Sequence, residues 1–177
     1  MSESFNHLIA PDIANNTFSK LQGIFEDIQY NLVRIKIRGG KKKNIQILAE
    51  KQDFTMSIKD CGKLSKILKF YFDNNESEFE DYALEISSPG IERPLTREQD
   101  FDTWSENRIS VHAVSQNVLP VKFDAMLKGY SEKGVKIEVL NKDTKVFDTF
   151  FLKPNQIKEV KIRWINKEIP TVRRIQS

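Results

Sequence analysis

The first half of the chain alternates between apolar residues at helical spacing and apolar residues at strand spacing. A helix is predicted by apolar residues that recur at intervals of three and four positions, namely Phe18, Leu21, Ile24, Phe25 and Ile28. Two apolar segments follow, NLVRIKI and NIQILAE, and they flank the turn-forming run GGKKK. These two segments predict a β-hairpin over residues 31–50.

A second helix and a third strand complete this first pattern. Ser57 precedes Asp60 by three residues, which is typical of a capping box, and one helical stripe follows that consists of Ile58, Cys61, Leu64, Leu68 and Phe72. The segment YALEI then predicts a third strand. Helix, strand, strand, helix and strand over residues 13–86 predict a two-layer α+β domain with its helices on one side of the sheet.

The second half of the chain reads as a run of short strands. Thr96 and Gln99 predict a capping pair for a short helix that ends near Trp104. Five strands are predicted after it by the segments RISVHAV, VKFDAMLKGY, VKIEVL, KVFDTFFL and IKEVKIRW. Because short antiparallel strands without helices must hide their edges, residues 97–165 predict a small, closed or nearly closed antiparallel β-barrel. Residues 1–12 and 166–177 are expected to be terminal tails.

The segment between the two patterns, LEISSPGIERPLT, is rich in residues that restrict the backbone. Pro89 and Gly90 fit the central positions of a type II turn, because proline presets φ at the first position and glycine accepts the positive φ of the second. Pro94 fixes a further φ. Residues 87–96 therefore predict a stiff joint between two domains, from which Glu92 and Arg93 project.

The composition is that of a globular protein from a reducing compartment. A chain of 177 residues accommodates one domain or two small ones, and its 39% apolar residues are enough for a core. No apolar run reaches the roughly 18 residues of a membrane span, and the first residues lack a signal-peptide pattern. Cys61 is the only cysteine, which excludes an internal disulfide. We expect a cytoplasmic protein without membrane association.

Charges of both signs are clustered, although the net charge is only +3. The basic run consists of Arg34, Lys36, Arg38, Lys41, Lys42 and Lys43. The acidic run consists of Asp73, Glu76, Glu78, Glu80, Asp81 and Glu85. Two surfaces of opposite sign are expected.

Each charged run has two interpretations that the sequence leaves open. The basic hairpin is either a contact for RNA phosphates or a solvated turn. The acidic run, Asp73 to Asp81, is either a contact for a basic protein or a solvated helix end and loop. Arg93, expected to be exposed on the stiff joint, is suited to a carboxylate or phosphate of a partner, or to an interdomain salt bridge.

The residue types that could support nucleophilic catalysis lack suitable neighbours. Ser87 and Ser88 lie outside any Gly-x-Ser-x-Gly elbow, and the two histidines, His7 and His112, fall in the predicted N-terminal tail and in a predicted strand. Cys61 lies on the apolar stripe of the second helix, where a cysteine behaves as a small hydrophobe. We expect no catalytic residue, no metal and no cofactor.

The glycine and aromatic patterns do not indicate a nucleotide or base-binding site. Gly129 and Gly134 have the spacing of a Walker loop, but Val135 stands where its lysine is required, so a hairpin turn is predicted. A Gly-x-x-Gly clamp for single-stranded RNA is absent from the sequence. Phe150, Phe151 and Trp164 are expected to pack in the barrel.

The string SSPGIERPL, together with YNLVRIKI and SIKDCGKLSKIL, resembles the bacterial ribosome maturation factor family RimP. Members carry Ser-Pro-Gly-x-x-Arg-Pro-Leu at this junction, and here the string runs unbroken from Ser88 to Leu95. The resemblance extends over most of the chain. It identifies as the family motif and joint the residues Ser87, Ser88, Pro89, Gly90, Arg93, Pro94 and Leu95.

The resemblance implies a KH-like N-terminal domain, an Sm-like C-terminal barrel and no catalysis. It also implies binding to the immature free small ribosomal subunit, through rRNA and a ribosomal protein near the decoding region. We expect a monomer, with the basic run as the candidate rRNA contact and the acidic run as the candidate protein contact. The alternative is a small RNA-binding or RNA-processing protein that is not tied to ribosome assembly. The sequence departs from the family at Lys59, in the basic GGKKK turn and after Trp164.

Overall fold

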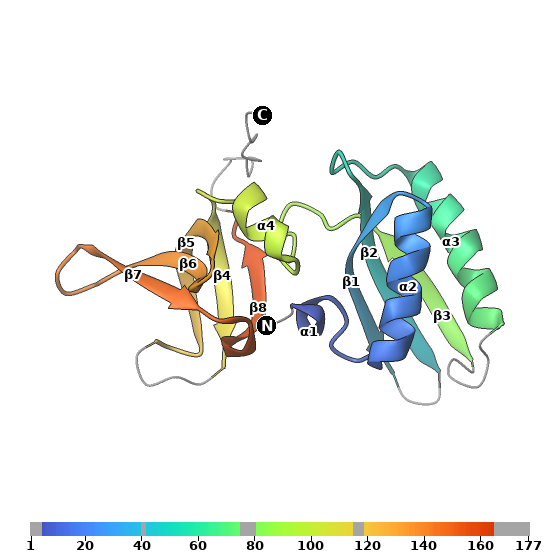
Figure 1. Cartoon of the computed structure of the whole chain (residues 1–177), viewed down its shortest axis with the longest axis horizontal. Helices are drawn as coiled ribbons and strands as arrows, with labels where there is room; N and C mark the ends of the chain where they lie inside the picture. The colour runs from blue at the N-terminus through green and yellow to red at the C-terminus, as the bar shows by residue number, and fades with distance from the viewer. Residues whose placement is uncertain (1–4, 40–41, 75–80, 115–118, 165–177) are drawn as a thin grey trace. The chain divides into compact units, whose positions relative to one another are not determined.

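The computed structural model describes residues 5–39, 42–74, 81–114 and 119–164, and it divides into two compact units (Figure 1). Residues 9–89 form the first, which we call the N-terminal unit. Residues up to 8 and residues from 90 onward form the second, which we call the C-terminal unit. The chain therefore passes between the units twice, after Leu8 and after Pro89.

The N-terminal unit has the predicted order of elements and is an α+β structure. Its elements are α2 (Asn15–Asp27), β1 (Tyr30–Arg38), β2 (Lys43–Lys51), α3 (Ile58–Asp73) and β3 (Tyr82–Ser87). The sheet order is β1-β2-β3, in which β1 and β2 form the predicted antiparallel hairpin and β2 pairs with β3 in parallel. Both helices lie on the same side of this sheet (Figure 1).

The core of the N-terminal unit follows from the two helical stripes and the sheet side chains that they cover. α2 buries Phe18, Leu21 and Phe25, and α3 buries Leu64, Leu68 and Phe72 against sheet residues that include Ile35, Ile45 and Ile47. The predicted α3 stripe differs at its first two positions, because Ile58 is 92% exposed and Cys61 is only half-buried. The stripe that faces the core therefore begins at Leu64.

The C-terminal unit contains the five predicted strands. Its elements are α1 (Asn6–Ile9), of which Ile9 already belongs to the other unit, α4 (Glu98–Thr103), β4 (Arg108–Ala113), β5 (Lys122–Ser131), β6 (Gly134–Leu140), β7 (Phe147–Leu152), η1 (Pro154–Gln156) and β8 (Ile157–Ile162). Neighbouring strands pair antiparallel in the order β7-β6-β5-β4-β8. The predicted turn at Gly129 to Gly134 is the β5–β6 hairpin.

The expected closed barrel is wrong for the described residues, because β7 and β8 are the two edges of the sheet and do not pair with each other. The outer edge of β8 is occupied by the chain just before α4. The Leu95 amide donates to the Val160 carbonyl (2.9 Å) and the Ile162 amide donates to the Arg93 carbonyl (3.0 Å). An edge strand that already has a partner cannot also pair with β7.

The predicted N-terminal tail also differs from the structure, because residues 5–8 are part of the C-terminal unit. Phe5 is 5% exposed and Leu8 is 1% exposed, and both belong to the core of that unit. The Phe5 ring lies 5.0 Å from the Phe101 ring and 5.6 Å from the Tyr130 ring, between centroids. Residues 5–8, which the sequence pattern predicts to be part of a tail, therefore contribute to a hydrophobic core.

Candidate nucleic-acid and protein interfaces

The predicted joint begins as a turn at the end of β3. Ser87 is the last residue of β3 and pairs with Leu48 of β2. Gly90 adopts φ +75°, the positive value that the predicted turn requires of its glycine. The Ser87 hydroxyl donates to the Ser88 carbonyl (3.0 Å), so it is engaged with the local backbone.

The second half of the joint is an integral part of the C-terminal unit. Residues 93–95 pair with β8, and an isolated bridge joins Pro94 to Lys161. Leu95 is fully buried in the core of this unit. The segment that connects β3 to the second unit is therefore only residues 88–92.

Arg93 is buried, so the expectation of an exposed arginine on the joint is wrong. Its side chain is 3% exposed, and its guanidinium carbon lies 4.5 Å from the centroid of the Trp104 ring. A guanidinium at this distance from an indole face makes a cation–π interaction, which is strongest when water is excluded. Arg93 thus fastens the joint to Trp104, the residue that ends α4.

The start of α4 is held by a carboxylate and not by the predicted Thr96–Gln99 pair. The Asp100 carboxylate accepts hydrogen bonds from the backbone amides of Thr96 and Arg97, each 3.0 Å long. It also receives the Arg97 guanidinium, with Nη2 2.6 Å and Nε 3.0 Å from Oδ1. Asp100 is 1% exposed, so this charge is buried together with its donors.

The residues of the basic run have different environments. Arg34 is buried in β1, Lys36 and Lys43 are half-buried, and Arg38 and Lys42 are exposed. Lys41 lies outside the described residues. The part of the run that is open to a partner is therefore the end of the hairpin, at Arg38 and Lys42.

The acidic run meets the basic run at one end of the sheet. The Lys43 amide donates to the Asp81 carbonyl (3.0 Å), and Lys43 pairs with Tyr82 across the β2–β3 register. Asp73, Asp81 and Glu85 are exposed, whereas Glu76, Glu78 and Glu80 lie outside the described residues. The two predicted surfaces of opposite sign are thus neighbours, which weakens the field of each.

Asp73 is bound to the side chains around it. Its carboxylate accepts from the Tyr82 hydroxyl (2.6 Å) and lies 3.0 Å from the Lys69 ammonium. The hydrogen bond from Tyr82, followed by that from Lys69, lowers the pKa of Asp73. Burial and the same hydrogen bond raise the pKa of Tyr82 to about 12.

The first turn of α3 is fixed to the sheet through Asp60. The predicted capping box forms, since the Ser57 hydroxyl accepts from the Asp60 amide and the Asp60 carboxylate accepts from the Ser57 amide. The same carboxylate accepts from the Tyr30 hydroxyl (2.6 Å) and lies 3.3 Å from the Lys51 ammonium. Hydrogen bonds from Ser57 and Tyr30 lower the pKa of Asp60, and the bond to Asp60 raises the pKa of Tyr30 to about 12.

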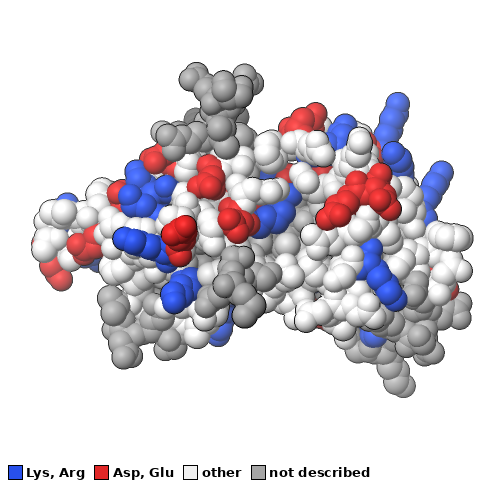
Figure 2. All heavy atoms as spheres, in the orientation of Figure 1, with Lys and Arg blue, Asp and Glu red and all other residues white. Residues whose placement is uncertain are grey.

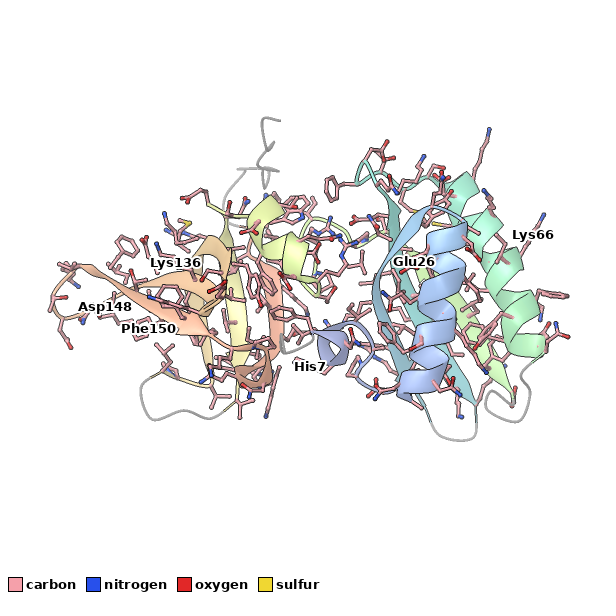
Figure 3. The ribbon with its side chains drawn as sticks, viewed as in Figure 1. His7, Glu26, Lys66, Lys136, Asp148 and Phe150 are labelled. Atoms are coloured by element: carbon pink, nitrogen blue, oxygen red, sulfur yellow. The ribbon has the colours of Figure 1, made fainter. Side chains whose placement is uncertain are left out.

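A basic surface that the sequence interpretation missed lies on the outer side of α3. We call it the α3 lysine face, and its four lysines are all exposed: Lys59, Lys63, Lys66 and Lys69. In Figure 2, Lys and Arg side chains project from the edge of the N-terminal unit where Figure 1 places α3, and Figure 3 shows Lys66 pointing away from the sheet. The signal was present in the sequence, because intervals of four, three and three residues keep these lysines on one side of a helix.

Two of the residues that were considered for catalysis, Cys61 and His7, belong to different units. Cys61 is half-buried on α3, and the His7 ring nitrogen Nε2 lies 2.9 Å from the Ile157 carbonyl, in the other unit from Cys61 (Figure 3). Within the described residues, no three side chains of the metal-ligating types gather at one place. None of the described helices has the length and apolar character that a bilayer span requires.

Residues 20–92 match the family model of the RimP N-terminal domain. The matched range covers most of the N-terminal unit and continues through the turn at Gly90 into residue 92.

Proposed function

We propose that the chain is a ribosome maturation factor of the RimP family, which binds the immature small ribosomal subunit and assists its assembly without catalysis. The observation that carries this proposal is the match of residues 20–92 to the RimP N-terminal domain. The unbroken motif from Ser88 to Leu95 supports it, since the motif lies where the chain passes from one unit to the other.

The proposed binding mode uses both units, and the finer fold classes belong to the same proposal. The N-terminal unit would be KH-like and the sheet of the C-terminal unit Sm-like. The exposed basic residues, Arg38 and Lys42 among them, would contact rRNA, and the acidic residues Asp73 and Asp81 would contact a basic ribosomal protein. Phosphate contacts need only accessible positive charge, whereas the protein contact needs complementary charge.

The construction of the joint favours binding through two surfaces. Residues 93–95 are hydrogen-bonded to β8, so only residues 88–92 are free of such pairing in the connection that follows β3. A second contact made through a short linker has a high effective concentration and little chain to order on docking. A protein that binds its target through both units can therefore bind it more tightly than either unit does alone.

Sedimentation of a cell extract tests the proposed function directly. We expect the protein to comigrate with free small subunits in a sucrose gradient and to be depleted from translating ribosomes. A strain that lacks the protein should accumulate immature small subunits. If the protein binds RNA in vitro but migrates at the top of the gradient, the alternative function, an RNA-binding protein outside ribosome assembly, is supported.

A proline substitution in the free part of the joint tests the contribution of its stiffness. We expect Pro89→Gly to weaken small-subunit binding and to leave the urea unfolding midpoints of both units unchanged, because Pro89 restricts the linker and not a core. Pro120→Gly is the matched control, because Pro120 is exposed just before β5 and is not part of residues 87–96. Normal subunit affinity of Pro89→Gly would contradict the proposed role of the joint.

A further inference from the structure

The α3 lysine face lies on the side of α3 opposite the side that is buried in the core. Leu64, Leu68 and Phe72 direct the opposite side of α3 into the core, which fixes the orientation of the helix. The lysines from Lys59 to Lys66 then occupy about 10 Å along the helix axis, at 1.5 Å per residue. Neither Lys59 nor Lys66 makes an ion pair with any described residue, and Lys63 lies over the Tyr30 ring (5.7 Å).

The acidic residues of α3, Asp60 and Asp73, lie near its two ends and do not neutralise the lysines in the middle of this face. Asp60 is turned toward the sheet, where its carboxylate is engaged by Tyr30, Ser57 and Lys51. Asp73 neutralises Lys69 at the last turn. The remaining positive charge is concentrated over Lys59, Lys63 and Lys66.

This arrangement does not serve the stability of the helix. Lysines three and four positions apart repel one another, whereas an alternation of acid and base would support the helix. Lys59 stands in the first turn, where the helix dipole disfavours a positive charge. A repeat of like charges that opposes its own helix indicates an external partner of opposite charge.

Gly62 lies in the middle of the α3 lysine face and opens its surface. It is exposed in the interior of α3, and a Cβ placed there would have no atom within 4 Å. Glycine weakens a helix relative to alanine, and neither packing nor a positive φ requires it here. Its absence of a side chain lets an extended ligand approach the helix backbone between the lysines.

Phe70 adds an exposed aromatic ring to the same side. It lies four residues after Lys66 and is 74% exposed, although it belongs to a helix with a well-formed core face. Aromatic rings beside a basic groove serve as stacking platforms for nucleic-acid bases.

We propose that the α3 lysine face binds the phosphate backbone of RNA without sequence preference, with Lys59, Lys63 and Lys66 on phosphates and Phe70 against a base. Lysine provides a point charge and no base-specific geometry, which makes the contact independent of sequence. That this RNA is rRNA of the small subunit rests on the proposed function.

An anionic membrane surface fits this face less well than RNA does. A helix that lies on a membrane needs a continuous apolar side to insert, with lysines along its borders. The two exposed apolar residues of α3, Ile58 and Phe70, stand at opposite ends of the helix with the lysines between them. The continuous apolar side of α3 is already buried in the core.

The test measures binding of the full chain to a fluorescently labelled single-stranded RNA of mixed sequence by anisotropy, over a series of KCl concentrations. The variant Lys59→Gln/Lys63→Gln/Lys66→Gln should reduce the slope of log K against log salt by about 2, since each single-strand phosphate contact contributes about 0.7. At 100 mM salt the affinity should fall at least tenfold. Phe70→Ala should lower the affinity without changing the slope.

The matched control is Lys142→Gln/Lys153→Gln/Lys158→Gln, which removes three exposed lysines from the C-terminal unit. It changes the net charge equally and should keep the wild-type slope. The inference would be overturned if the α3 variant kept the wild-type RNA affinity and salt slope. It would also be overturned if the α3 variant kept its RNA binding but lost a binding to phosphatidylserine vesicles that the wild-type protein shows. If the triple variant fails to fold, Lys66→Glu alone should still reduce the affinity, because the side chain points into solvent.

The sucrose gradient separates this inference from the proposed function. If wild-type protein comigrates with small subunits and the α3 variant is unchanged in RNA binding, the inference fails and the proposed function stands. If the α3 variant loses RNA affinity but wild-type protein does not comigrate with subunits, the proposed function fails and the inference stands.

Discussion

Replacing Phe5 by alanine should destabilise the C-terminal unit and leave the N-terminal unit unaffected. Phe5 is 5% exposed and packs against the Phe101 and Tyr130 rings, in a core whose other residues, apart from Leu8, come after position 90. Truncation of a buried phenylalanine to alanine costs about 3–5 kcal/mol, which includes the lost aromatic pairs. Because Phe5 stays 5% exposed whereas Phe101 is fully buried, we expect the lower end of this range, about 3 kcal/mol.

The two tryptophans make the assay specific to one unit. Trp104 and Trp164 both belong to the C-terminal unit, and Trp104 lies in the same core as Phe5. Tryptophan fluorescence therefore follows this unit, while far-UV circular dichroism is dominated by α2 and α3 of the N-terminal unit. With an m value of about 1.5 kcal/mol/M, the fluorescence midpoint in urea should fall by about 2 M.

A matched control in the same unit is Phe147→Ala, because Phe147 is 55% exposed on the edge strand β7. Its midpoint should change by less than about 0.5 M, as expected for a surface substitution. The reasoning would be refuted if Phe5→Ala moved the fluorescence midpoint no further than this control does. The reasoning would also be refuted if only the circular dichroism midpoint moved, because Phe5 would then stabilise the N-terminal unit.

Three further substitutions test local features. Gly62→Ala should raise the stability of the N-terminal unit by about 1 kcal/mol, measured by circular dichroism in urea, because nothing lies within 4 Å of the new Cβ. Gly134→Ala should lower the stability of the C-terminal unit by more than about 1 kcal/mol, measured by fluorescence, because its φ is +116° and the new Cβ would meet the Leu152 carbonyl. The lowered pKa of Asp60 implies that its stabilising effect is present above about pH 4 and is lost as the pH falls further. Asp60→Asn should therefore reduce the midpoint at pH 6 and flatten its decline between pH 4 and 2.

The elements of both units could be predicted because their patterns are local. The helical stripes of α2 and α3 and the five short strands each repeat over enough residues to define a period. The capping box at Ser57 and the glycine turn at Gly90 were predictable for the same reason, because neighbouring residues supply all the partners. The lysines of α3 were equally local, and they were missed because the interpretation followed only the apolar side of that helix.

The features that could not be predicted depend on residues far apart in the chain. Phe5 and Leu8 are too few to define a period, and their partners lie beyond residue 90. The open sheet results from the pairing of residues 93–95 with β8. No local sequence pattern predicts this pairing. Arg93 was expected to meet a partner because arginine is usually exposed, whereas in the structure its guanidinium lies against the Trp104 ring.

The passage of the chain through the C-terminal unit, then the N-terminal unit and back again has a consequence for synthesis. Phe5 is made about 100 residues before Phe101, which at 5–20 residues per second is a delay of about 5–20 seconds. The N-terminal unit, residues 9–89, is complete within that interval and can fold on the ribosome. Phe5 and Leu8 therefore stay exposed until the strands that cover them have been synthesised. During that interval a chaperone or another nearby surface can bind them.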